Sequence, residues 1–202
     1  MFQRTLFFSV LWFFVFLLPI EIHAGESISG SDPEWGIESL MRGMAAVKQR
    51  KAKYTEKQYA AVLTRPLVSS GRLSFVAPST LEKLTEHPVR ISYRAEGDNF
   101  IIKKQNKRPR VVLLSDYPVL WAFIESLRAT LRGDLKVLNN FYSIKLEGDR
   151  AGWSLNLRPR DKEMSGIIQS IRLSGVDADL NRVEIREVEG DRSLMSIESD
   201  PS

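Results

Sequence analysis

The 202-residue chain contains no cysteine and only two histidines. Without thiols it can form no disulfide, no cysteine nucleophile, no zinc–thiolate site and no lipid-modified cysteine. Neither sign of charge dominates, since 29 Lys and Arg stand against 25 Asp and Glu, for a net charge of +4. With 43% hydrophobic and 27% charged residues, the composition is that of a globular protein, and the length suits one domain.

Long hydrophobic runs are equally scarce, and the one at residues 6–19 lies close to the N-terminus. A single arginine precedes it and the small residue Ala24 follows it, which is the pattern of a secretory signal peptide cleaved after Ala24. A membrane anchor is the alternative, but Glu21 and His23 close the run before the roughly 20 apolar residues that a span needs. We therefore predict an exported protein, which argues against the nucleic-acid partner that a basic chain suggests.

Two segments have helical periodicity. Ser31-Asp32-Pro33-Glu34 resembles a capping box and predicts a helix start, followed by an apolar stripe of Trp35, Leu40, Met41, Met44 and Val47. The second helix is expected between an Asp116 N-cap with Pro118 in the first turn and a stop at Gly133, with a further turn at residues 135–139. Its apolar stripe consists of Leu120, Phe123, Ile124, Leu127 and Leu131.

From Tyr54 onward the apolar residues alternate with polar ones, as in Trp153, Leu155 and Leu157, which predicts antiparallel strands with one apolar face. Turn signals separate the strands, among them Ser69-Ser70-Gly71 and Gly97-Asp98-Asn99. The predicted order is one helix, about six strands, a second helix and about five strands. The apolar face of a long sheet has to be covered. Because two helices are embedded among the strands, we expect the helices to cover this face and to enclose an apolar hollow.

The chain resembles the LolA-like family of periplasmic outer-membrane lipoprotein carriers. The matching segments are residues 54–59, 66–75, 78–83, 97–100, 131–134, 153–159 and 171–175, with Pro118 and Leu120 ahead of the second helix. The resemblance implies an α+β, mainly β fold: a strongly curved, unclosed antiparallel barrel of about eleven strands under helices that form a lid. Residues 25–202 would form a single carrier domain after a signal peptide at residues 1–24.

The resemblance also implies a function. Members are periplasmic, non-enzymatic shuttles that take acylated lipoproteins from an inner-membrane transporter to an outer-membrane acceptor, with transient membrane contact. We expect a monomer that uses no cofactor. The alternative is a structural or assembly protein of the envelope, in which the same sheet has a solid core.

With the resemblance, the apolar stripes predict a cargo cavity, although periodicity alone favours a filled core and does not fix which strand faces point inward. The candidate cavity residues are Leu73, Phe75, Tyr93, Phe100, Ile102, Leu120, Trp121, Phe123, Ile124, Leu127, Trp153, Leu155, Ile171 and Leu173. The second candidate site is a basic hairpin tip, which would dock to anionic headgroups or to an acidic partner. The alternative without a binding role is a solvated turn that protects a strand edge. Its residues are Lys103, Lys104, Lys107, Arg108 and Arg110.

One position departs from the family. Well-studied carriers have an arginine just before the proline that follows the second strand, and it tethers the lid, whereas this chain has Ala77 ahead of Pro78. Alanine donates no such hydrogen bonds. The lid is therefore held differently, or the cargo is a glycolipid or another acylated product.

Catalytic and metal sites find little support. His87 with Ser70 and Asp98 would be needed for a hydrolase, but no G-x-S-x-G motif is present. A second group superficially resembles a calcium loop, but Arg182 stands where such a loop needs glycine. That group consists of Asp177, Asp179, Asn181 and Glu184. We therefore predict no enzymatic activity and no bound metal.

Overall fold

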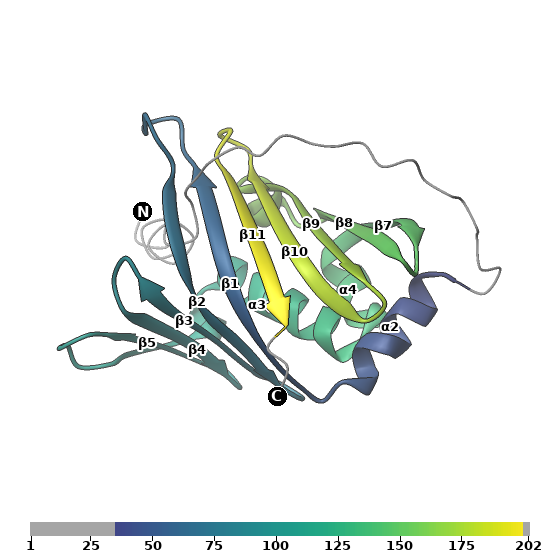
Figure 1. Ribbon diagram of the computed structural model, residues 1–202, viewed down its shortest axis with the longest axis horizontal. Coiled ribbons are helices and arrows are strands. Elements are labelled where there is room, and N and C mark those ends of the chain that lie inside the picture. The colour runs from purple at the N-terminus through teal and green to yellow at the C-terminus, as the bar shows by residue number, and fades with distance from the viewer. Residues whose placement is uncertain (1–34, 200–202) are drawn as a thin grey trace.

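The computed structural model describes residues 35–199. The predicted signal peptide and the predicted helix start at Ser31 lie outside this range. Within it, the chain forms one continuous sheet with helices on one side, and Figure 1 shows the sheet bent strongly around them.

Eleven strands pair antiparallel in the order β6-β5-β4-β3-β2-β1-β11-β10-β9-β8-β7. The strands are β1 (Gln49–Tyr59), β2 (Leu67–Val76), β3 (Thr80–His87), β4 (Ile91–Glu96), β5 (Asn99–Lys104), β6 (Arg110–Leu113), β7 (Tyr142–Asp149), β8 (Gly152–Pro159), β9 (Ile168–Val176), β10 (Asp179–Glu187) and β11 (Arg192–Ser199). Since β6 and β7 are the two edges, the sheet is curved but not closed. The predicted fold class, with six strands before the central helix and five after it, is confirmed.

Helices connect the two edges of the sheet. The chain leaves β6 through the short 3-10 helix η2 (Leu114–Asp116), then forms α3 (Pro118–Arg132) and α4 (Leu135–Phe141) before it enters β7. The N-terminal α2 (Ile37–Ala46) packs on α3, and Figure 1 shows these helices together on one face of the sheet. A further short helix, α5 (Lys162–Ser165), was not predicted. Within residues 35–199, none of the helices has the length and apolar character needed to cross a bilayer.

The ends of α3 follow from its sequence. Pro118 occupies the first turn, where its missing N–H removes no helical bond, and Gly133 ends the helix with a φ of 69°. A Cβ at Gly133 would lie 2.0 Å from the Met41 carbonyl oxygen, so glycine also permits close contact between α2 and the end of α3. Asp116 is not the N-cap, because it belongs to η2 and Tyr117 stands at that position.

Three further local predictions were wrong. The N-terminal helix starts only at Ile37, where Ser39 Oγ accepts a hydrogen bond from the Gly36 N–H at 2.9 Å, so Trp35 precedes it. Strand β1 starts at Gln49, five residues before Tyr54, so the basic residues of this segment belong to the first half of the strand. The segment Ser69-Ser70-Gly71 lies inside β2, at a register shift against β3, rather than in a turn.

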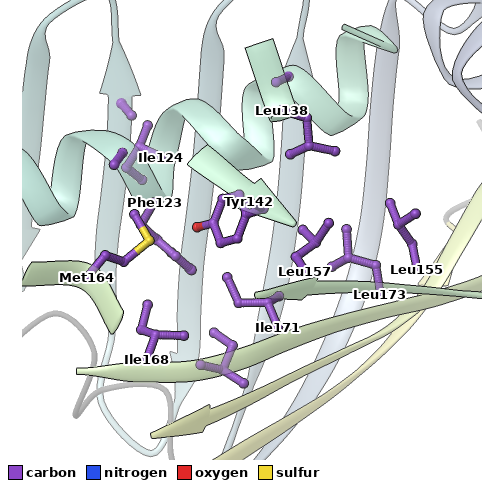
Figure 2. Close-up of a cluster of buried hydrophobic side chains, with 14 of the residues drawn as sticks. Phe123, Ile124, Leu138, Tyr142, Leu155, Leu157, Met164, Ile168, Ile171 and Leu173 are labelled. Carbon is purple, nitrogen blue, oxygen red and sulfur yellow. The ribbon is translucent and has the colours of Figure 1, made fainter. Parts of the chain in front are cut away.

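The hydrophobic core lies between the helices and the inner face of the sheet. Figure 2 shows Phe123 and Ile124 of α3 facing the strand residues Ile171 and Leu173, with Tyr142 between the two layers. These side chains are almost fully buried. Among the described residues, the members of this cluster come from the helices, from β4 and β5, and from β7 to β10. None of them comes from the central strands β1, β2 and β11.

Candidate functional site

The inner face of the sheet has two apolar wings. In one wing Leu155 pairs with Leu173, and Leu157 with Ile171, so that β8 and β9 present a continuous apolar surface. In the other wing Ala95 pairs with Phe100 across β4 and β5. Directly paired residues in an antiparallel sheet share one face, so each row of partners lies on the side covered by the helices.

Most of the candidate cavity residues lie on this covered face. Ten of the fourteen are buried. They are Phe75, Tyr93, Phe100, Leu120, Phe123, Ile124, Trp153, Leu155, Ile171 and Leu173. Leu73, Ile102 and Leu127 are partly buried, and cross-strand pairing places Leu73, Lys83, Tyr93 and Ile102 in one row.

Trp121 does not join the others. Its side chain is 40% exposed, and its ring stands edge-on to Phe141 with 5.3 Å between the centroids. Since Leu120 and Ile124 lie on the buried side of α3, a residue one step after Leu120 points about 100° away from it. Trp121 therefore lies on the outer side of the helical cover.

Polar residues occupy the centre of the inner face, between the two wings. Glu56 of β1 accepts hydrogen bonds from Lys83 Nζ at 2.5 Å and from Ser193 Oγ at 2.8 Å, and Ser69 Oγ lies 3.5 Å from the same carboxylate. The hydroxyls of Tyr54 and Thr85 are hydrogen-bonded at 2.8 Å. We call these six residues the polar cluster: Tyr54, Glu56, Ser69, Lys83, Thr85 and Ser193.

Gly71 makes the polar cluster possible. Tyr54 pairs with Gly71 across β1 and β2, and Gly71 pairs with Thr85 across β2 and β3. Because β2 offers no side chain at this position, groups from β1 and β3 can meet above it. A Cβ at Gly71 would also lie 1.9 Å from the Leu84 carbonyl oxygen, so the backbone itself requires glycine.

Burial changes the titration of the charged pair. Glu56 has an exposed fraction of 0%, and its burial raises the pKa to about 7 against the opposing attraction of Lys83. Burial likewise lowers the pKa of Lys83 to about 8, against the attraction of Glu56. The cause is the same in both, since each loses water around its charged form.

An arginine on α3 ties the helical cover to the sheet. Arg128 is 4% exposed, and its guanidinium donates to the Ser79 carbonyl oxygen at 2.7 Å through Nε and to the Gly97 carbonyl oxygen at 2.9 Å. Its neighbour Arg132 is more exposed and reaches the Pro78 carbonyl oxygen at 3.4 Å. The guanidinium thus lies on the cover and the acceptors on the sheet, next to the position where this chain has Ala77.

The Gly97-Asp98 turn holds the start of the cover as well. The Asp98 carboxylate accepts hydrogen bonds from the Ser115 N–H at 2.9 Å and from Ser115 Oγ at 2.7 Å. The Asp98 carbonyl accepts a third bond from the Leu114 N–H at 2.8 Å. One turn between β4 and β5 therefore fixes both η2 and the middle of α3.

The basic hairpin tip joins β5 to the edge strand β6, and its residues are exposed. Lys103 and Lys104 end β5, while Lys107 and Arg108 lie in the turn and Arg110 begins β6. Further along β6, Val111 and Leu113 are also exposed, at 55% and 46%. The tip therefore presents cationic groups beside apolar ones at one edge of the sheet.

The groups considered for catalysis and metal binding are engaged elsewhere. Ser70 and His87 are cross-strand neighbours, but the Asp98 carboxylate binds Ser115. Asp177 pairs with Arg150 at 2.5 Å, and Asp179 with Arg50 at 3.4 Å. In the part of the chain that the structure describes, no group of three or more His, Asp or Glu side chains is placed to hold a metal ion.

The polar cluster and Arg128 were not predicted, although each leaves a trace in the sequence. Glu56 follows Tyr54 by two residues and Lys83 follows Leu81 by two, so alternation places both charges on the apolar faces of their strands. Arg128 follows Ile124 by four residues, within the apolar stripe of α3. A charged residue at an inward-facing position is the signal in all three cases.

Comparison with known proteins gives a match over nearly the whole chain. The sequence model of a family described as "Outer membrane lipoprotein carrier protein LolA-like" matches residues 27–197. No curated protein matches the chain.

Several solved structures have a similar chain path. A LolA superfamily protein from Nitrosomonas europaea is 8% identical with a TM-score of 0.43, over 82% of this chain and 94% of that one. A chain of the MucA/MucB complex from Pseudomonas aeruginosa is 12% identical with a TM-score of 0.43, over 82% of this chain and 58% of that one. A putative outer membrane lipoprotein-sorting protein domain from Vibrio parahaemolyticus is 10% identical with a TM-score of 0.40, over 80% of this chain and 88% of that one.

Proposed function

The chain belongs to the outer membrane lipoprotein carrier protein LolA-like family, and from this premise we propose that it is a periplasmic carrier for acylated cargo. In this proposal the inner face of the sheet receives acyl chains under α2, α3 and α4. The protein takes them from a donor at the inner membrane and passes them to an acceptor at the outer membrane, without a chemical step and as a monomer.

One observation carries the proposal: two apolar wings lie under a helical cover that few polar contacts attach to the sheet. Burying a methylene group contributes about 0.8 kcal/mol, so an acyl chain of about sixteen carbons resists leaving a membrane by on the order of 12 kcal/mol. A carrier has to offer an apolar surface of comparable extent, and the cover has to move for the chain to enter.

Uptake of a neutral apolar dye, N-phenyl-1-naphthylamine, by the mature protein tests this function. A carrier takes up the dye stoichiometrically, and acylated ligands displace it. Phe123→Ala removes an aromatic contact from the covered face and weakens dye binding, whereas Trp121→Ala, on the outer side of the same helix, leaves it unchanged. Absence of dye uptake would reject the carrier and favour the envelope protein with a solid core.

Mass spectrometry of lipids that co-purify from the periplasm identifies the cargo. Arg128 holds the cover where this chain lacks an arginine at position 77, and we propose a divergent carrier whose cargo is a glycolipid or another acylated product. Recovery of lipoproteins alone would reject this part of the proposal.

The basic hairpin tip is the proposed docking surface for membrane headgroups. Lys103, Lys104, Lys107 and Arg108 are all exposed on one projecting hairpin. Each cationic residue near an anionic membrane surface contributes about 1 kcal/mol of attraction. The same hairpin protects the edge strand β6 from pairing with another chain, and the two roles are compatible.

A further inference from the structure

The polar cluster occupies a place where a purely apolar carrier would have apolar side chains. In register, Ser193 pairs with Ile185, which pairs with Ile171, so one row leads from the cluster into the apolar wing of β9. On the other side, Lys83 pairs with Tyr93, which pairs with Ile102. The cluster is thus the polar middle of a face that is apolar to both sides.

The cluster is rich in hydrogen-bonding groups and has no net charge. The Glu56 carboxylate and the Lys83 ammonium are 0% and 6% exposed, and they balance each other. Four hydroxyl groups surround them, from Tyr54, Thr85, Ser69 and Ser193, and each hydroxyl can both donate and accept. A buried ion pair contributes little to stability compared with apolar residues of the same size, so stability alone does not account for its presence.

We propose that the polar cluster is a headgroup site that binds the uncharged polar part of an acylated cargo, such as an ester, amide or hydroxyl group, while the acyl chains lie along the apolar wings. This inference rests on the proposed carrier function and specifies its substrate class. The side chains of Tyr54 and Thr85, which meet above Gly71, would contact the headgroup together with the rest of the cluster.

Charge balance selects against charged headgroups. An anionic group above the cluster approaches Lys83 but also the Glu56 carboxylate, which lies 2.5 Å from the ammonium. A cationic group approaches the Glu56 carboxylate but also the Lys83 ammonium, which repels it. In a site with little water, neither repulsion is screened as it is in solution. Hydroxyls and carbonyls need only exchange hydrogen bonds with the cluster, so an uncharged headgroup meets no opposing charge.

Three sixteen-carbon ligands test the selection when each displaces the naphthylamine dye below its micelle concentration. They are 1-palmitoylglycerol, hexadecyl sulfate and hexadecyltrimethylammonium, which are uncharged, anionic and cationic. We expect the wild-type protein to bind the uncharged ligand at least about tenfold more tightly than either charged one, the equivalent of one unpaired hydrogen-bonding group.

Single substitutions should reverse the selection. At a pH below the lowered pKa of Lys83, Glu56→Gln leaves the ammonium unbalanced and is expected to raise the affinity for hexadecyl sulfate by about tenfold. At a pH above the raised pKa of Glu56, Lys83→Met leaves the carboxylate unbalanced and does the same for the cationic ligand. The double variant has no charge in the cluster, and we expect it to bind the uncharged ligand most tightly, as the wild type does. Glu82→Gln is the matched control, because Glu82 lies next to Lys83 on the opposite face of β3, where it binds Ser92. It should leave the wild-type ranking unchanged.

The outcomes separate this inference from the carrier function. Dye uptake with equal displacement by all three ligands, or single variants that keep the wild-type ranking, would overturn the headgroup site and leave the carrier proposal intact. Absence of dye uptake overturns both. If a single variant does not fold, the wild-type and double-variant rankings still decide. A diacylated lipopeptide and an alkyl glycoside then distinguish the two sources of uncharged headgroups, and binding of neither would also contradict the site.

Discussion

Replacing Arg128 by methionine should release the helical cover from the sheet. The substitution removes two charge-assisted hydrogen bonds, of 2.7 Å to the Ser79 carbonyl and 2.9 Å to the Gly97 carbonyl, and keeps most of the apolar stem. The cost of burying the guanidinium, which also lowers the Arg128 pKa, offsets part of their strength. We expect the closed state to lose about 2–3 kcal/mol, which increases the open population by about 30- to 150-fold.

Hydrogen exchange of the α3 backbone amides measures this opening. In the Arg128→Met variant, these amides should exchange faster by that factor, while the amides of β9 and β10 keep their rates. Arg132→Met is the matched control, since Arg132 makes a 3.4 Å contact with the Pro78 carbonyl and partly exposed ion pairs with Glu125 and Asp134. Its effect should stay within about 0.5 kcal/mol. Equal acceleration in both variants, or none in Arg128→Met, would refute the role of Arg128 as the tether.

Three further predictions concern stability and docking. Burial raises the Glu56 pKa from 4.5 to about 7, so stability falls as the pH rises from about 4.5 to 7. Burial lowers the Lys83 pKa from 10.5 to about 8, so stability recovers between about pH 8 and 10.5. Each change is at most about 1.4 kcal/mol per pH unit. Urea midpoints of Glu56→Gln/Lys83→Met should lack both slopes, and a curve parallel to the wild type would contradict this. Gly71→Ala forces a Cβ to 1.9 Å from the Leu84 carbonyl and should lower the free energy of unfolding by about 2 kcal/mol or more, whereas Gly152→Ala, with nothing within 4 Å, should change it by less than about 0.5 kcal/mol. Lys103→Glu/Lys104→Glu should weaken association with anionic vesicles at low salt by at least about tenfold, and Lys136→Glu, on α4, should not; equal binding would remove the docking role.

Periodicity predicted the elements whose two faces meet different surroundings. The strand residues Trp153, Leu155 and Leu157 alternate because one face meets the helices and the other meets solvent, and all three are buried as expected. The ends of α3 were likewise predictable, because Pro118 and Gly133 have backbone requirements that only certain positions of a helix satisfy. Trp121 could have been placed correctly too, since it lies off the stripe that contains Leu120 and Ile124.

Features that depend on contacts between distant strands could not be predicted. Glycine after two serines is typical of a turn, but Gly71 is required by the carbonyl of Leu84, thirteen residues later. Strands were predicted only from Tyr54 onward, yet an exposed outer face accepts Lys51 and Lys53 within a strand. Glu56 and Lys83 lie on different strands, and only the register through β2 brings them together.

In the proposed carrier, the position of the tether affects the balance between holding and releasing cargo. Arg128 binds backbone carbonyls of two turns, so on opening both the guanidinium and its acceptors become accessible to water, which replaces the lost hydrogen bonds. Loss of these hydrogen bonds then contributes only a few kcal/mol to the cost of opening, far below the roughly 12 kcal/mol that burial of a sixteen-carbon chain contributes. In the proposed carrier, acyl burial therefore outweighs the tether in determining whether cargo stays bound, and the tether contributes to how often the cover opens. An acceptor that offers a better apolar site can then remove cargo during openings that occur without it.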